Sequence, residues 1–159
     1  DGNNVLHDLL LAGVSLGHDV KYATPEGMEP NVEVIERAEK IARQTGAQIT
    51  ATNDPSEAVT DAGVIYTDIF VSMGEEHMKD KFAAFEGFQV NEELVSNAND
   101  NYLFMHCLPA HRGEEVTDAV IDSKNSIVFD QAENRMWAQM SLLTYMCNPI
   151  AWNAYRDLY

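Results

Sequence analysis

The sequence predicts a single doubly wound, Rossmann-like α/β domain built on a mostly parallel sheet. Short strand-like apolar runs alternate with amphipathic helical stretches along the chain, without an internal repeat or a low-complexity tract. A length of 159 residues is that of one domain. Because the chain opens on turn residues, Asp1–Asn4, and continues into a helix, we expect the first strand of the fold to lie upstream of Asp1 and to be missing from this domain.

Local signals predict the elements of the first half of the chain. Gly17 and Gly46 follow helical stretches, a position at which glycine commonly ends a helix. Asn31 stands before the second helical stretch as an N-cap, and Asp54 with Pro55 opens the third. The patterns predict helices over residues 5–16, 31–44 and 55–61, and strands over residues 19–23, 47–51 and 63–67.

The second half continues this alternation. Residues 102–107 form an apolar run that stops before Pro109, which cannot donate a backbone hydrogen bond and therefore ends the strand. The remaining patterns predict helical segments over residues 75–85 and 91–98, a helix over 114–121, a strand over 126–129 and a final helix over 132–147.

The charge of the chain restricts its partners. Twenty-six acidic residues stand against ten basic residues, which gives a net charge of −16. Such a charge repels phosphate backbones and anionic membrane surfaces. The longest apolar runs, such as residues 9–12, are also too short to cross a bilayer. We therefore expect small-molecule substrates as partners, and neither nucleic acid nor a membrane.

The cysteines indicate a reducing environment. The chain has two of them, Cys107 and Cys147, which do not form a disulfide framework or a zinc-spaced cluster. No signal-peptide pattern opens the chain. We expect a cytoplasmic protein that requires no metal ion and no organic cofactor.

Polar side chains gather after the predicted strands. Residues 3–4, 68–74, 106–110 and 130–135 all fall at the carboxyl edge of the predicted sheet, where open α/β sheets bind their ligands. Each group by itself is ordinary turn, cap or surface chemistry. Their convergence at one edge is what predicts a binding site.

The residue types at this edge suit a substrate that carries an amine and a second substrate that is an anion. Asp68 can hold an ammonium group, and Ser72 with the backbone after it can orient a small polar molecule. Arg135, expected near a helix N-terminus, can bind an anion together with free backbone N–H groups. His106 and Cys107 supply a hydrogen-bond donor and a polarisable thiol beside a carbonyl centre.

Several motifs together resemble one enzyme family. They are Asp1–Asn4, Tyr22–Gly27, Asp68–Gly74, His106–Ala110 and Glu133–Arg135. In their order and spacing they resemble the ornithine carbamoyltransferases, members of the aspartate/ornithine carbamoyltransferase family, over essentially the whole chain. The resemblance implies that residues 1–159 form the C-terminal, ornithine-binding domain, and that the N-terminal domain, which binds carbamoyl phosphate, is absent from the chain.

The same resemblance implies an activity. The family transfers a carbamoyl group from carbamoyl phosphate to the side-chain amine of ornithine, which gives citrulline and phosphate, without a metal ion or cofactor. The full-length enzyme is expected to be a homotrimer, and this chain alone is expected to be inactive.

The resemblance also assigns roles by position. Asn4, Asp68, Ser72 and Met73 would bind ornithine, with the α-ammonium group facing Asp68 and the carboxylate meeting Asn4 and the backbone near Met73. Ornithine arrives with protonated amines, because an alkylammonium group has a pKa of about 10.4. The site must therefore remove a proton before the side-chain amine can react.

The remaining roles concern the reacting groups. His106 would hydrogen-bond the carbamoyl oxygen, and Arg135 would contact carbamoyl phosphate. Cys107 and the carbonyl of Leu108 would lie beside the reacting amine, and the Leu108–Pro109 peptide bond would be cis. Asp68, His106, Cys107 and Arg135 thus form the expected catalytic set, with a thiolate at Cys107 as one destination for the proton.

Other functions fit parts of the same pattern. A putrescine carbamoyltransferase shares the His-Cys-Leu-Pro motif, although Ser72-Met73-Gly74 favours ornithine. A non-catalytic amino-acid-binding module would follow if Asp1 were the true N-terminus. A flavodoxin-like phosphoacceptor domain would share the fold class, but the chain lacks paired acidic residues after a first strand.

Overall fold

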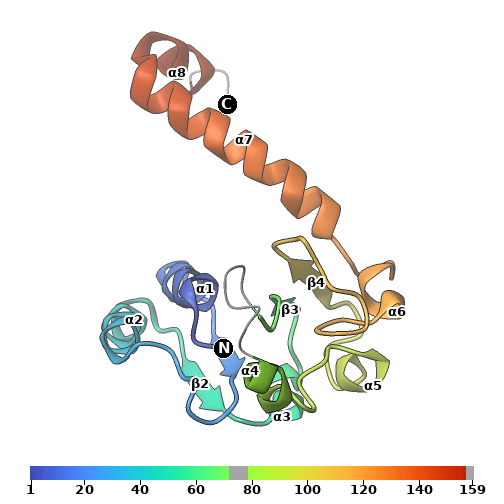
Figure 1. Cartoon of the computed structure of the whole chain (residues 1–159). Helices are drawn as coiled ribbons and strands as arrows, with labels where there is room; N and C mark the ends of the chain where they lie inside the picture. The colour runs from blue at the N-terminus through green and yellow to red at the C-terminus, as the bar shows by residue number, and fades with distance from the viewer. Residues whose placement is uncertain (72–78, 157–159) are drawn as a thin grey trace.

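The computed structural model describes residues 1–71 and 79–156, and it confirms the predicted α/β alternation with parallel strands. The first half contains α1 (Asn4–Ser15), β1 (Val20–Ala23), α2 (Val32–Thr45) and β2 (Ile49–Thr52). The middle contains α3 (Pro55–Val59), β3 (Val64–Thr67), α4 (Lys79–Ala84) and α5 (Glu92–Val95). β4 (Leu103–His106), α6 (Asp118–Ile121), α7 (Val128–Cys147) and α8 (Pro149–Arg156) complete the chain (Figure 1).

The predicted helix boundaries in the first half follow from local capping. The side-chain oxygen of Asn3 accepts hydrogen bonds from the backbone N–H groups of Val5 and Leu6, which satisfies two donors at the start of α1. Asn31 caps α2 in the same way, as predicted, and Gly46 ends that helix with φ 84°. A residue other than glycine would be strained in this left-handed conformation.

The strands form two parallel pairs. β1 pairs with β2 from Val20–Ile49 onwards, and β3 pairs with β4 so that the last register pair is Thr67–His106. A single bridge joins Phe104 of β4 to Ser126. Among the described residues, the strands thus form two separate two-stranded sheets, of order β1-β2 and β3-β4. The first strand expected upstream of Asp1 stays a prediction.

Each strand pair has its own hydrophobic core. Leu10 and Val14 of α1 are fully buried against α2 and β1, in a cluster that includes Tyr22. The second cluster surrounds Phe104 of β4, which is fully buried, and includes Ile65 of β3. This second core holds the ends of β3 and β4 side by side, and the candidate site lies at those ends.

Two predicted elements near the C-terminus are wrong. The strand predicted over 126–129 is reduced to a single parallel bridge from Ser126 to Phe104, because α7 already begins at Val128. The helix predicted over 114–121 forms only as α6, because Glu115 is buried in a loop whose turn passes through Gly113 at φ 86°. The final helix begins at Val128 rather than at residue 132, and α8 was not predicted.

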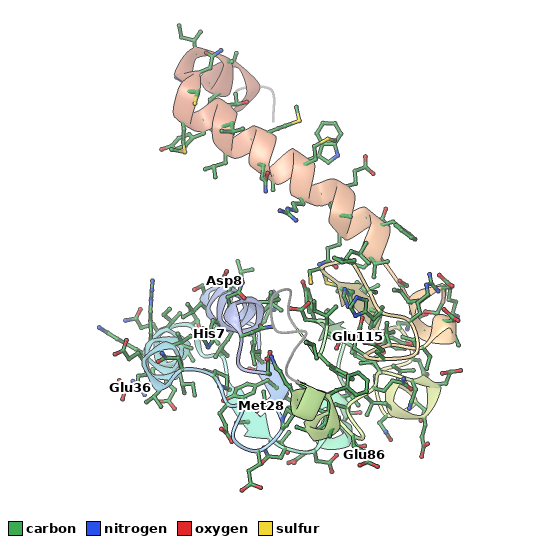
Figure 2. The ribbon with its side chains drawn as sticks, viewed as in Figure 1. His7, Asp8, Met28, Glu36, Glu86 and Glu115 are labelled. Carbon is green, nitrogen blue, oxygen red and sulfur yellow. The ribbon has the colours of Figure 1, made fainter. Side chains whose placement is uncertain are left out.

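The long helix α7 extends away from the part of the molecule that carries the strands, and α8 folds back at its far end (Figure 1). Its side chains project on several sides of the helix (Figure 2). They include the exposed apolar residues Met136, Trp137, Met140, Leu142, Leu143, Tyr145 and Met146. Among the described residues, no helix is both long and apolar enough to cross a membrane.

Candidate active site

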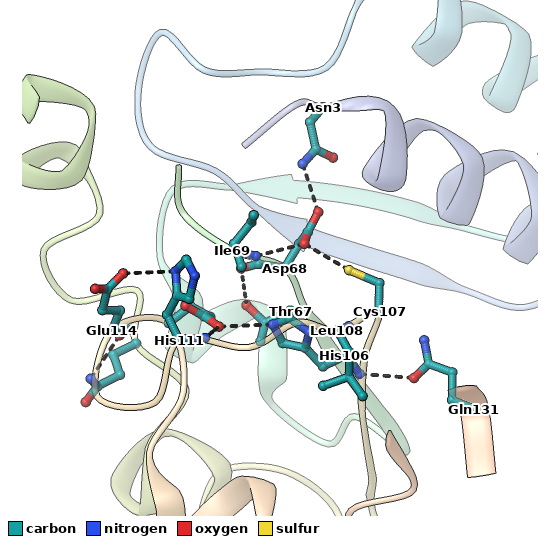
Figure 3. Close-up of polar contacts among 12 residues, drawn as sticks. Asn3, Thr67, Asp68, Ile69, His106, Cys107, Leu108, His111, Glu114 and Gln131 are labelled. Atoms are coloured by element: carbon teal, nitrogen blue, oxygen red, sulfur yellow. Dashed lines mark hydrogen bonds and ion pairs between the residues drawn. The ribbon is translucent and has the colours of Figure 1, made fainter. Parts of the chain in front are cut away.

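The candidate site begins where β3 and β4 end together. Because Thr67 and His106 are the last register pair, the next residues, Asp68 and Cys107, emerge from the same edge. The Sγ atom of Cys107 donates a hydrogen bond to Oδ1 of Asp68 over 2.9 Å (Figure 3). Residues 39 positions apart in the chain are thus brought into contact by strand register, as the sequence predicted for this edge.

The N-terminus of α1 also reaches this carboxylate. Nδ2 of Asn3 donates to Oδ2 of Asp68 over 3.1 Å, while the oxygen of the same amide caps α1. The backbone N–H of Ile69 donates to Oδ1 over 2.8 Å. Asp68 is therefore held by donors from α1, from its own loop and from the end of β4. Asn4, which was predicted to bind substrate, is the exposed first residue of α1, and its role stays a prediction.

The environment of Cys107 keeps its thiol protonated at neutral pH. Burial is the largest cause, and the hydrogen bond and negative charge of Asp68 add to it, so that the pKa of Cys107 is raised to about 11. A hydrogen bond from Tyr66 acts in the opposite direction. The thiolate expected as a proton acceptor is therefore disfavoured as long as the ionised Asp68 faces the sulfur.

Two further residues contact this site without having been predicted. Nε2 of Gln131, in the first turn of α7, donates to the hydroxyl of Tyr66 on β3 over 3.2 Å. Oε1 of the same amide accepts from the backbone N–H of His106 over 3.0 Å. Burial is the main reason that the pKa of Tyr66 is raised to about 12, so its hydroxyl stays protonated at neutral pH.

His106 is fully buried and uses both ring nitrogens within the protein. Its Nδ1 accepts from the backbone N–H of Leu108 over 2.9 Å, so the hydrogen resides on Nε2. That hydrogen points to Oε1 of Glu115 over 3.1 Å. Glu115, which was not among the predicted site residues, is fully buried among the side chains near β4 and α6 (Figure 2). A hydrogen bond from His106 to a carbamoyl oxygen would require one of these two bonds to be exchanged.

The remaining predicted residues have different positions. The Leu108–Pro109 peptide bond is cis, as the resemblance implies, and Leu108 packs against the second core. Because α7 begins at Val128, Arg135 lies beyond the first turn rather than at the helix N-terminus. It is exposed, and in the described part of the chain it makes no hydrogen bond or ion pair with the Asp68–Cys107 pair. Ser72 and Met73 lie outside the described residues.

One group of side chains has the composition of a cation site. Ligand atoms of His111, Glu114 and Glu115 lie within 4.8 Å of one another. Glu115 is already bonded to the ring of His106 and to the backbone N–H of His111, and His111 pairs with Glu114 over 3.3 Å. This group therefore organises the loop between β4 and α6 through its own contacts.

The fold is of the doubly wound α/β class, in which ligands bind beyond the carboxyl ends of the strands, and Asp68 and Cys107 meet at that edge. The family model of the aspartate/ornithine carbamoyltransferase Asp/Orn-binding domain matches residues 1–146. The chain therefore belongs to the aspartate/ornithine carbamoyltransferase family.

Its relatives point to one branch of that family. The chain is 56% identical over 144 residues to the catabolic ornithine carbamoyltransferase of Thermoplasma acidophilum, covering 90% of this chain and 47% of that protein. It is 54% identical over 151 residues to the anabolic enzyme of Pyrococcus furiosus, covering 94% of this chain and 48% of that protein. The chain thus spans about half the length of these relatives.

Solved structures agree with this assignment. The structure of the ornithine carbamoyltransferase from Pyrococcus furiosus superposes with a TM-score of 0.87 at 56% identity, covering 91% of this chain and 46% of that one. The anabolic enzyme from Campylobacter jejuni gives a TM-score of 0.88 at 37% identity, covering 94% of this chain and 50% of that one. The relatives include both catabolic and anabolic enzymes, so the two metabolic directions share this domain.

Proposed function

We propose that this chain is the ornithine-binding domain of an ornithine carbamoyltransferase. The whole protein would transfer the carbamoyl group of carbamoyl phosphate to the side-chain amine of ornithine, and a second, carbamoyl-phosphate-binding domain would supply the rest of the site. The observation that carries the proposal is the carboxylate of Asp68, held by Asn3 and Cys107 at the ligand edge of a domain of this family. We also propose that the whole protein is a cytoplasmic homotrimer.

The carboxylate of Asp68 is suited to the α-ammonium group of ornithine. A cation that binds there would compete with the thiol of Cys107 for Oδ1, which already accepts from the backbone N–H of Ile69, while Oδ2 accepts from Asn3. The displaced thiol would then be available to the reacting side-chain amine. Pairing Asp68 with a cation also removes one cause of the raised pKa of Cys107, which makes its thiolate more accessible during turnover.

The reaction itself needs few groups. The side-chain amine, once deprotonated, attacks the carbamoyl carbon, and the bond from that carbon to the phosphate oxygen breaks as phosphate leaves. His106 and the Leu108 carbonyl would orient the carbamoyl group, and Arg135 would contact the phosphate after the helix α7 meets its partner domain. Asn4, Ser72 and Met73 would complete the ornithine site. No step in this scheme requires a metal ion or an organic cofactor.

The test is steady-state kinetics of the complete protein with Asp68→Asn. We expect the KM for ornithine to rise by about 10- to 100-fold, because a charge-assisted hydrogen bond contributes about 1.5–3 kcal/mol. The KM for carbamoyl phosphate should change little. Asp8→Asn, on the exposed side of α1, is the matched control. An unchanged KM for ornithine would remove Asp68 from the ammonium site.

Product analysis separates this proposal from its alternatives. The complete protein supplied with ornithine and putrescine in turn should form citrulline at a much higher kcat/KM than carbamoylputrescine. The reverse preference would identify a putrescine enzyme. Ornithine binding by calorimetry without formation of citrulline would instead indicate a binding module.

A further inference from the structure

Among the described residues, β4 has a full strand on one side only, and the start of α7 lies along its other side. There Phe104 donates to the carbonyl of Asn125 over 2.8 Å and accepts from the N–H of Ile127 over 3.0 Å. Alternate residues of a strand direct their N–H groups to the same side. Two residues later, the N–H of His106 accordingly donates to Oε1 of Gln131 over 3.0 Å. The side chain of Gln131 thus takes the place of the next carbonyl group of a neighbouring strand.

The same amide also reaches β3. Nε2 of Gln131 donates to the hydroxyl of Tyr66 over 3.2 Å. The bond to the backbone fixes the orientation of the amide, because only its oxygen can accept from an N–H group. One side chain in the first turn of α7 is therefore hydrogen-bonded to both strands that end at the candidate site.

The first turn of α7 attaches the whole helix to the strands. Val128 is buried and Gln131 is half-buried, whereas every residue from 132 to 143 is exposed. Arg135 follows Gln131 by four residues, so it lies on nearly the same face of the helix, about 6 Å further along its axis. The first turn therefore sets the direction in which α7 leaves the strands, and with it the position of Arg135 (Figure 1).

We propose that Gln131 is a positioning residue for carbamoyl transfer: by bonding the first turn of α7 to β3 and β4, it places Arg135 for the phosphate group of carbamoyl phosphate. This inference rests on the function proposed above. The amide itself contacts no substrate. Its effect falls on the anion rather than on ornithine, because Asp68 has donors of its own from α1, from its loop and from the end of β4.

The test compares the binding of the two substrates to the complete protein. Calorimetry gives the Kd of carbamoyl phosphate, and steady-state kinetics gives the KM of ornithine. Gln131→Met keeps the length of the side chain but removes both hydrogen bonds. It should raise the Kd of carbamoyl phosphate about three- to tenfold, the effect of one or two lost hydrogen bonds, and leave the KM of ornithine unchanged. The matched control is Gln44→Met, on an exposed position of α2, which should change neither constant.

A double-mutant cycle with Arg135→Ala tests whether the amide acts through the guanidinium group. If it does, adding Gln131→Met to Arg135→Ala should change the Kd of carbamoyl phosphate by less than about twofold, because the group that the amide places is already gone. A full three- to tenfold loss in the double variant would overturn the inference. Tyr66→Phe removes only one of the two bonds, so it should weaken carbamoyl phosphate binding by a smaller factor. The same cycle run with Tyr66→Phe decides the matter if Gln131→Met does not fold.

The outcomes separate this inference from the proposed function. An unchanged Kd of carbamoyl phosphate in Gln131→Met overturns the positioning role, even if the protein makes citrulline. Equal weakening of both substrates would mean that the amide only supports the fold, and this would also overturn the inference. Selective weakening that disappears in the Arg135→Ala background supports it. The same result in a protein that forms no citrulline supports the positioning of Arg135 and rejects the transferase.

Discussion

Asp68→Asn tests the electrostatics of the site without any substrate. The pKa of Cys107 is raised from 9.0 to about 11, and burial is the largest of the causes. The hydrogen bond and charge of Asp68 are the next two causes, and both favour the protonated thiol. The asparagine keeps an acceptor oxygen for Ile69 but removes the negative charge. The pKa of Cys107 should therefore fall, with burial left as the main cause of its elevation.

The assay is alkylation of the Cys107 peptide as a function of pH. Below both pKa values the rate follows the thiolate fraction, so alkylation at pH 8 should become about tenfold faster for each unit by which the pKa of Cys107 falls. Asp8→Asn makes the same change of charge on an exposed position of α1 and should leave the rate alone. A rate in Asp68→Asn equal to that of the unmodified protein would refute the reasoning, because the charge beside the sulfur would then have no effect on its proton.

The remaining predictions concern stability. The pKa of Cys107 is higher in the folded chain than in the unfolded chain, so its contribution to stability is complete below about pH 9 and is lost as the pH rises to about 11. The free energy of unfolding of Cys107→Ser, measured by chemical denaturation, should therefore fall less steeply over that range than that of the unmodified protein. Glu115→Ala should cost about 2–4 kcal/mol of unfolding free energy because His106 loses its buried acceptor, whereas Glu115→Gln keeps an acceptor and should cost less than half as much. Phe104→Ala, at a fully buried position, should lower the free energy of unfolding by about 3–5 kcal/mol. Leu103→Ala, at a position that is 41% exposed, should lower it by less than about 1 kcal/mol, and chemical denaturation measures both. Equal costs within either pair would contradict the burial of Glu115 or of Phe104.

Local chemistry made much of the fold predictable. Asn31 and Gly46 bracket α2 within one residue of the predicted ends, because an N-cap and a left-handed C-cap act on neighbouring backbone groups. The end of β4 before Pro109 is equally local. The partnership of β3 with β4 follows from the alternation of helices and strands, which favours parallel neighbours.

The errors fall where packing overrides local preference. The run from Ile127 to Phe129 has the composition of a strand, yet α7 begins within it at Val128, which is buried while Phe129 is exposed. Glu115 lies in a stretch with helical character, but the chain there forms a loop that brings its carboxylate to His106. A buried acid of this kind depends on a partner nine residues earlier, which no local pattern reveals.

The sequence alone determined the class of fold and the approach of Asp68 and Cys107 at the ends of β3 and β4, since both depend on strand ends and local motifs. Only the tertiary structure decided which groups touch. It placed Asn3 against Asp68, and it joined Gln131 to Tyr66 and to the backbone of His106. These contacts depend on register and helix placement over many residues, and a hydrogen bond responds to displacements of a few tenths of an ångström, which no sequence pattern specifies.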